Sequence, residues 1–203
     1  YWPAPGTATG KNGTPTARTA GTAFSVTANA VDANWNVVNT ASDTVSITST
    51  DPNAAMPVNA ALVSGTKNFN VTLTTAGSAM LTATDVTDNG KTGSTSPTLT
   101  VNAGLATKLQ ILLPGETAAP GTTTGKSGTP NTQTAGSALI NGIVVNAVDA
   151  NWNVIATATP NVILSSSDGN AVIADDNGAT VGQLTLAAGT RTACAVSQTV
   201  TRA

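Results

Sequence analysis

The chain contains one nine-residue string twice, NAVDANWNV, at Asn29–Val37 and again at Asn146–Val154. A second pair of segments is nearly identical, with PGTATGKNGTP at Pro5–Pro15 and PGTTTGKSGTP at Pro120–Pro130. The period of 115 to 117 residues is far longer than the roughly 20–50 residues of a solenoid repeat. It matches the length of a small β-sandwich domain, about 100 residues. The chain is therefore expected to hold two similar domains in tandem.

The composition points to an all-β fold. Charged residues make up 9% and aromatic residues 3% of the chain, and Thr, Val and Ala dominate the patterned segments. Branched side chains at Cβ suit a pleated sheet, and no stretch has the pattern of an amphipathic helix. The net charge of −2 and the absence of a basic stripe argue against nucleic acid, so no nucleic-acid partner is expected. No apolar run approaches the roughly 20 residues of a membrane-spanning helix, so the chain is not expected to span a membrane.

Alternation with a period of two residues predicts the strands. In Ala23–Val31 one face carries Phe24, Val26, Ala28 and Ala30. In Lys67–Thr74 the residues Phe69, Val71 and Leu73 are expected to point inward, and in Lys108–Ile111 the residues Leu109 and Ile111. Short strands separated by turn clusters are typical of antiparallel sandwiches with one solvated face. Asn102-Ala103-Gly104 is the natural hinge, so the two sandwiches are predicted to run end to end.

Several of these segments together resemble the Ig-like repeats of large bacterial surface proteins, including invasin- and adhesin-type arrays. The resemblance rests on Ala106–Ile111, a Pro/Gly/Thr loop, a Thr-Ala-Gly step, and Val-Asp-Ala-Asn-x-Asn-Val. It covers essentially the whole chain, twice, and its motifs are structural. It implies two Ig-like domains, an extracellular or cell-surface location, and a role in stalks, adhesins or filaments.

The predicted repeats are residues 1–103 and residues 104–203, and each lacks a different strand. The first has no counterpart of the opening strand Thr107–Leu113. When Ser78–Thr87 is aligned with Thr190–Thr199, the second has no final strand. Two interpretations stay open: the chain is a window from a longer array, or each end completes a neighbouring chain by strand addition.

The duplicated string has the oxygen spacing that opens a calcium-binding loop, in Asp32-Ala33-Asn34-Trp35-Asn36 and in residues 149–153. Such a loop also needs Gly at its sixth position and Glu at its twelfth, whereas Val37 and Val154 occupy the sixth and no acid occupies the twelfth. A turn in which Asp and Asn bond their own backbone is the favoured interpretation. Calcium is the alternative, and no metal site is predicted.

Trp35 and Trp152 stand where related repeats usually carry Gly. Gly adopts a positive φ at no steric cost and Trp does not. Either the turn has a different conformation, or the Trp side chain gains a compensating contact. That contact is either with the adjacent domain or a neighbouring chain, as is common for Trp at interfaces, or with its own domain as a lid. Trp35 and Trp152 are therefore the candidate inter-domain or inter-chain contact residues.

Catalytic chemistry finds little support in the residues. There is no His, so a Ser/His or Cys/His nucleophile is excluded. Asp175 and Asp176 are adjacent in a predicted turn, whereas two-acid catalysis needs carboxyls that face each other across a cleft. Cys194 is the single cysteine, which excludes an internal disulfide, and is expected to be buried and inert. No catalytic residue and no cofactor is predicted, and the chain is not expected to be an enzyme.

The sequence thus predicts a non-catalytic extracellular structural protein, an Ig-like building block or spacer of a surface stalk, sheath or filament. Its expected partners are neighbouring repeats or subunits of its own kind, with strand exchange between chains as one mode of assembly. The alternative is an adhesin-type binding module that recognises a surface glycan or protein through its end loops.

Overall fold

The computed structural model describes residues 2–87, 89–137, 142–173, 182–193 and 196–198. Its internal contacts divide the chain into two compact units, Tyr1–Asn102 (unit 1) and Ala103–Ala203 (unit 2). The boundary predicted from the sequence lies one residue later, with Ala103 in the first repeat. Cys194 and the pair Asp175-Asp176 lie outside the described residues.

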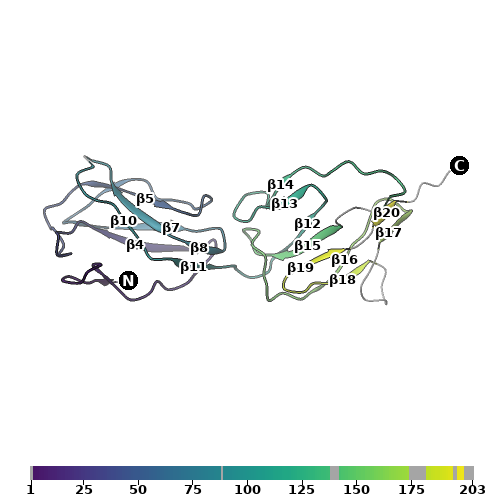
Figure 1. The fold of residues 1–203 in the computed structure, drawn as a ribbon, viewed down its shortest axis with the longest axis horizontal. Coiled ribbons are helices and arrows are strands. Elements are labelled where there is room, and N and C mark those ends of the chain that lie inside the picture. Colours follow the sequence, from purple (N-terminus) through teal and green to yellow (C-terminus); the bar gives the residue numbers. More distant parts are fainter. Residues whose placement is uncertain (1, 88, 138–141, 174–181, 194–195, 199–203) are drawn as a thin grey trace. The chain divides into compact units, whose positions relative to one another are not determined.

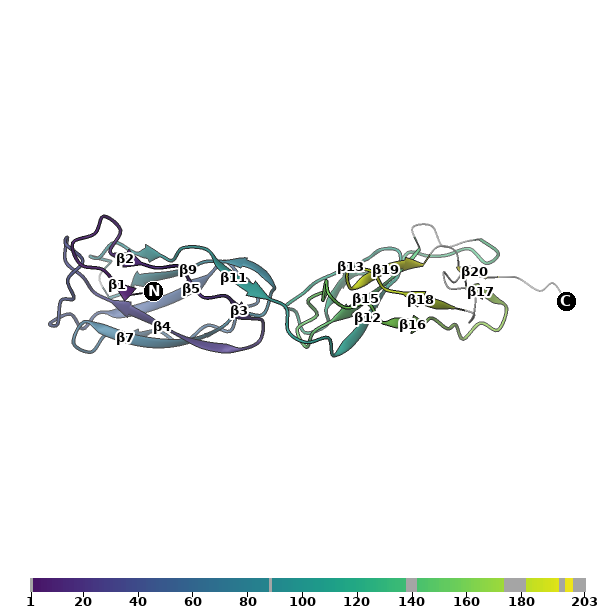
Figure 2. The same cartoon turned by 90° about the horizontal axis from the view of Figure 1, so that it is seen from below.

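Every regular element among the described residues is a β-strand, and most of the strand pairs are antiparallel. No described segment forms a helix long and apolar enough to cross a membrane. The strands of unit 1, shown in Figures 1 and 2, are β1 (Trp2–Pro3), β2 (Lys11–Asn12), β3 (Arg18–Thr19), β4 (Ala23–Asn29), β5 (Thr44–Ser49), β6 (Ala60–Ala61), β7 (Thr66–Thr72), β8 (Gly77–Ala79), β9 (Leu81–Asp85), β10 (Ser94–Thr95) and β11 (Leu99–Asn102).

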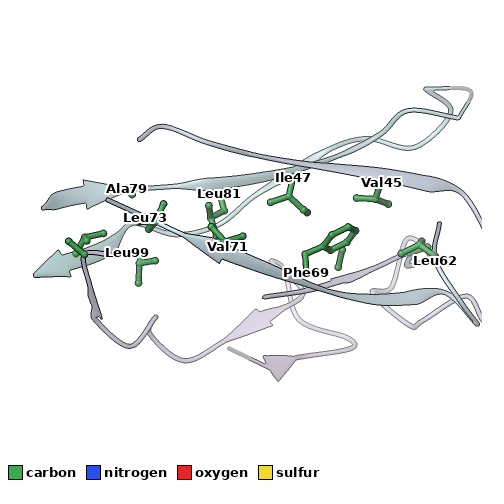
Figure 3. Packing of buried hydrophobic residues seen from close by; sticks show 13 residues of the cluster. Val45, Ile47, Leu62, Phe69, Val71, Leu73, Ala79, Leu81 and Leu99 are labelled. Atoms are coloured by element: carbon green, nitrogen blue, oxygen red, sulfur yellow. The ribbon is translucent and has the colours of Figure 1, made fainter. Parts of the chain in front are cut away.

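Unit 1 is built as a β-sandwich-like stack around one apolar core. Strands β4 and β7 pair with each other, β5 pairs with β6 and β9, and β11 pairs with β3 and β8. Figure 3 shows Phe69 and Val71 of β7 pointing toward Ile47 and Leu81 of the opposing strands. Phe69, Val71 and Leu73 are all at most 4% exposed. The predicted inward face of this strand is therefore confirmed.

Unit 2 repeats part of this plan. Its strands are β12 (Lys108–Leu112), β13 (Glu116–Ala118), β14 (Lys126–Gly128), β15 (Ile143–Val148), β16 (Asn161–Ile163), β17 (Ala171–Ile173), β18 (Gln183–Thr185), β19 (Thr190–Ala193) and β20 (Val196–Gln198). Figure 1 shows β12, β15 and β19 side by side in that order. The core gathers Ile143, Val145, Val162, Leu184 and Leu186.

The structure corrects the predicted burial in β12. Leu109 is 56% and Ile111 43% exposed, whereas Gln110 is only 3% exposed. The predicted alternation is correct, but the face that carries Gln110 is the buried one, and the face that carries Leu109 and Ile111 is the more exposed one. Leu109 and Ile111 line an open apolar depression with Val162, while the hairpin formed by β13 and β14 covers Gln110 on the other face, through the Gly125 carbonyl at its tip.

The structure also corrects the predicted alignment between the C-terminal half of the first repeat and that of the second. Thr66 of β7 pairs with Asn29, and Thr190 of β19 pairs with Asn146 in the same way. Each of these threonines follows a tight turn in which a non-glycine residue and then a glycine have positive φ, Ser64-Gly65 and Ala188-Gly189. Thr190 therefore corresponds to Thr66 and not to Ser78, so β15 and β19 are the counterparts of β4 and β7.

Candidate functional site: the tryptophan turn and the glycine loop

The duplicated string folds into a compact turn, the tryptophan turn, formed by residues 32–36 in unit 1 and residues 149–153 in unit 2. Asp32 Oδ1 accepts the backbone N–H groups of Asn34 at 2.8 Å and of Asn36 at 2.9 Å. The Asn36 side-chain amide donates to both carboxylate oxygens, at 3.2 and 3.0 Å. In unit 2 the same bonds join Asp149 to Asn151 and Asn153. The predicted hydrogen-bonded Asp/Asn turn is thus confirmed.

The donors that surround Asp32 also favour its charged form. Hydrogen bonds from the Asn36 side chain, and then from the backbone of Asn36 and Asn34, hold the pKa of Asp32 below its ordinary value. The carboxylate therefore serves as an acceptor for its own turn. In the described part of the chain, no group of three or more His, Cys, Asp or Glu side chains is placed so that it could hold a metal ion.

Trp35 and Trp152 lie at the left-handed position of their turns, with φ of 65° and 68°. The idea that Trp forces a different conformation on the turn is therefore wrong. A residue with a Cβ atom pays roughly 1–2 kcal/mol for this backbone conformation. The second alternative applies, in which the side chain gains a compensating contact.

That contact is with the second repeated motif, which forms a closed loop, the glycine loop, at residues 4–10 in unit 1 and residues 119–125 in unit 2. In unit 1 the Ala4 N–H donates to the Gly10 carbonyl at 3.0 Å, and the Thr7 hydroxyl donates to the Ala4 carbonyl at 2.7 Å. The Gly10 N–H in turn donates to Thr7 Oγ1 at 3.1 Å. The same three bonds recur in unit 2 between Ala119, Thr122 and Gly125.

The tryptophan turn docks on the glycine loop of its own unit. The Gly6 N–H donates to the Asn34 carbonyl at 3.0 Å. The Trp35 indole lies so close over Gly10 that a Cβ atom on Gly10 would overlap the ring, and Gly10 itself has a φ of +65°. In unit 2, Gly121 and Asn151 share the backbone bond, at 2.7 Å, and Trp152 lies over Gly125.

This packing is strong enough to hold the turn in its strained conformation. A Trp side chain that loses about half of its ~200 Å² of accessible surface gains about 2.5 kcal/mol. The gain exceeds the cost of a positive φ. Because both partners are duplicated, each unit gains the same contact independently.

Unit 2 adds a cation and a strand to this arrangement. Lys108 Nζ lies 3.7 Å from the centre of the Trp152 ring and donates to the Ala150 carbonyl at 2.7 Å. The Trp152 Nε1–H donates to the Thr123 carbonyl at 3.2 Å. The Gly104 N–H donates to Asp149 Oδ2 at 2.8 Å. Asp149 is consequently only 2% exposed, whereas its counterpart in unit 1 is solvent-exposed.

The structure thus brings each predicted tryptophan against a residue that the sequence did not single out. Each ring contacts its own unit, which is the lid arrangement. A contact of Trp35 or Trp152 with the adjacent domain or with another chain stays a prediction. Gly10 and Gly125 were missed as partners, as was Gln110. The signal for the glycines was available, since the two motifs are duplicated together and at nearly the same spacing.

The tryptophan turn and the glycine loop make the same contacts in both units of the chain. None of the protein-family models, curated proteins or solved structures compared with the chain matches it.

Proposed function

We propose that the chain is a non-catalytic extracellular structural protein. Its two units act as Ig-like antiparallel sandwiches and serve as a building block or spacer of a surface stalk, sheath or filament. The partners in this role are neighbouring repeats or subunits of the same kind.

One observation carries the proposal: the most distinctive residues of the repeat are used to fasten the repeat to itself. Trp35 lies over Gly10, and Trp152 lies over Gly125. The aspartate carboxylate of each tryptophan turn accepts hydrogen bonds from residues of the same turn. The same contact joins two segments of one unit in both copies, which supports a repeated structural module.

The first experiment measures self-association. A building block is expected to form larger species with rising concentration in sedimentation velocity, and fibres or sheets in negative-stain electron microscopy. A chain that stays monomeric at every concentration and forms no ordered assembly would eliminate the building-block version and leave the spacer version.

The second experiment separates a structural role from ligand recognition by the end loops. Trp35→Ala and Trp152→Ala are expected to lower the melting temperature, because they remove the packing on Gly10 and Gly125. A binding module predicts instead that the same variants abolish retention on a glycan array without changing the melting temperature. That second pattern would overturn the proposal.

A further inference from the structure

The corresponding sheet edge is paired with a strand in unit 2 and lacks such a partner among the described residues of unit 1. In unit 2, β12 pairs with one edge of β15 and β19 with the other, and the register places Gln110 opposite Asn146. In unit 1, β7 pairs with the corresponding edge of β4. No described residue of unit 1 pairs with the opposite edge of β4, which we call the open edge. Unit 2 therefore shows what kind of segment this edge accepts.

A chain of side-chain hydrogen bonds fixes β12 on β15. The Thr190 hydroxyl donates to Asn146 Oδ1 at 2.6 Å, and Asn146 Nδ2 donates to Gln110 Oε1 at 2.8 Å. Gln110 Nε2 then donates to the Gly125 carbonyl at 2.6 Å. Gln110 and Asn146 are buried, so each amide needs these partners. The glutamine thereby connects the sheet to the glycine loop.

The N-terminal part of the same segment covers the tryptophan turn. The Thr107 N–H donates to the Val148 carbonyl at 2.9 Å. Lys108 lies over the Trp152 ring, and the Gly104 N–H donates to Asp149. The segment Gly104–Leu112 therefore contacts the edge of β15 and the adjoining tryptophan turn through a glycine, a lysine and a glutamine at fixed spacing.

Unit 1 holds the corresponding groups in the same positions. The Thr66 hydroxyl donates to Asn29 Oδ1 at 2.7 Å, as Thr190 does to Asn146. The Gly10 carbonyl accepts the Ala4 N–H, as its counterpart accepts that of Ala119. In the described part of unit 1, no amide bridges Asn29 to Gly10, and no cation lies over Trp35.

We propose that the open edge of β4 binds an extended polypeptide segment of the β12 type, supplied by a further repeat of the same kind. Its pattern is Gly-x-x-x-Lys-apolar-Gln-apolar-Leu, as in Gly104–Leu112. The glutamine bridges the Asn29 amide to the Gly10 carbonyl, the lysine lies over Trp35, and the glycine N–H donates to Asp32. This inference rests on the proposed function, because it requires that such repeats meet.

The physical basis is strand addition with side-chain selection. An unpaired sheet edge offers a row of backbone donors and acceptors to any extended chain. Backbone bonds provide affinity without sequence preference, and the side-chain positions provide specificity. At this edge the selective groups are an amide, a carbonyl, an aromatic ring and a carboxylate, which match a glutamine, a lysine and a backbone N–H.

The binding experiment uses the full chain and a fluorescein-labelled peptide with the sequence of residues 103–113, measured by fluorescence anisotropy. The peptide is expected to saturate at one molecule per chain. A second peptide, with alanine in place of its lysine and glutamine, is expected to bind at least about tenfold more weakly. Equal binding of the two peptides would overturn the proposal, because backbone pairing alone would then explain the association.

Two variants of the chain locate the binding site. Asn29→Ala removes the amide that the glutamine would contact, and is expected to weaken binding about tenfold. Asn70→Ala is the matched control, since Asn70 is an exposed residue of β7 away from the open edge, and binding is expected to be unchanged. A larger loss with Asn70→Ala than with Asn29→Ala would overturn the assignment.

A fused variant keeps the proposal testable when free peptide binds too weakly to measure. Placing the sequence of residues 103–115 directly before Tyr1 gives β4 a strand in the same chain, with the spacing of unit 2. The melting temperature is expected to rise, and trans binding of the peptide to disappear. An unchanged melting temperature together with absent peptide binding would overturn the proposal. The proposed function is tested separately, because self-association of the parent chain is measured without peptide.

Discussion

The indole ring of Trp35 lies directly over Gly10, 25 positions earlier in the sequence, and leaves no room there for a Cβ atom. Trp152 and Gly125 repeat the relationship in unit 2. One tertiary contact thus explains why both motifs are duplicated and why a tryptophan occupies a left-handed backbone position.

The first prediction concerns the backbone strain at the tryptophan. Trp35→Ala and Trp35→Gly both lose the ring packing, but only alanine retains the cost of the positive φ. We expect the Gly variant to be about 0.5–1 kcal/mol more stable than the Ala variant, after allowing for the larger chain entropy of glycine when unfolded. Urea unfolding followed by circular dichroism measures the difference. An Ala variant as stable as the Gly variant would show that the turn is not strained.

The second prediction compares two glycines that share a positive φ. A Cβ atom on Gly13 would meet nothing within 4 Å, whereas one on Gly10 would overlap the Trp35 ring. We expect Gly13→Ala to cost about 1–2 kcal/mol from the backbone alone. Gly10→Ala adds the overlap and is expected to cost about 3 kcal/mol or more. Equal losses of unfolding free energy for the two variants would argue that the ring moves away freely.

The third prediction concerns Lys108. Lys108→Met keeps the aliphatic stem but removes the charge over Trp152 and the bond to the Ala150 carbonyl. We expect a loss of about 1 kcal/mol in the stability of unit 2. Lys108→Arg is expected to recover part of it, and Lys67→Met in β7 serves as the control. A charge-independent effect, with Arg no better than Met, would contradict the role of the cation.

The fourth prediction concerns acid stability. Burial works to raise the pKa of Asp51, but the N–H groups of Thr75, Thr74 and Asn53 outweigh it, and the net pKa lies below the ordinary value of 3.8. A carboxyl with a depressed folded pKa contributes stability above its unfolded pKa and loses it as the pH falls through the folded value. The melting temperature of unit 1 is therefore expected to be level from pH 7 to about pH 5 and to fall below about pH 4.

Asp51→Asn tests this assignment. The variant is expected to be less stable than the parent at pH 7, and the gap is expected to narrow as the pH approaches 2. Thermal unfolding across this range measures both effects. A gap that stays constant with pH would mean that the charge of Asp51 does not contribute.

The sequence predicted the features that depend on local pattern. Alternation in Lys67–Thr74 was sufficient for the buried face of β7, because the core covers that face along the whole strand. The Asp/Asn turn was also predictable, since its hydrogen bonds join residues two and four positions apart.

The features that the sequence did not predict depend on contacts between distant segments. Gln110 is buried only because the glycine loop of unit 2 lies over it and supplies the Gly125 carbonyl. The positive φ of Trp35 is stable only because Gly10 lies beneath the ring. Local rules correctly indicate that a buried amide and an aromatic residue with a positive φ each cost free energy. The partner that compensates this cost lies in another motif of the sequence.

The most direct test of the account is a double-mutant cycle between Gly10 and Trp35. Gly10→Ala is introduced into the parent chain and into the Trp35→Ala variant, and the free energy of unfolding is measured for all four proteins in urea. Removing the ring is expected to reduce the cost of Gly10→Ala by about 2 kcal/mol, to the value of Gly13→Ala. The same cost in both backgrounds would contradict the docking of the tryptophan turn on the glycine loop.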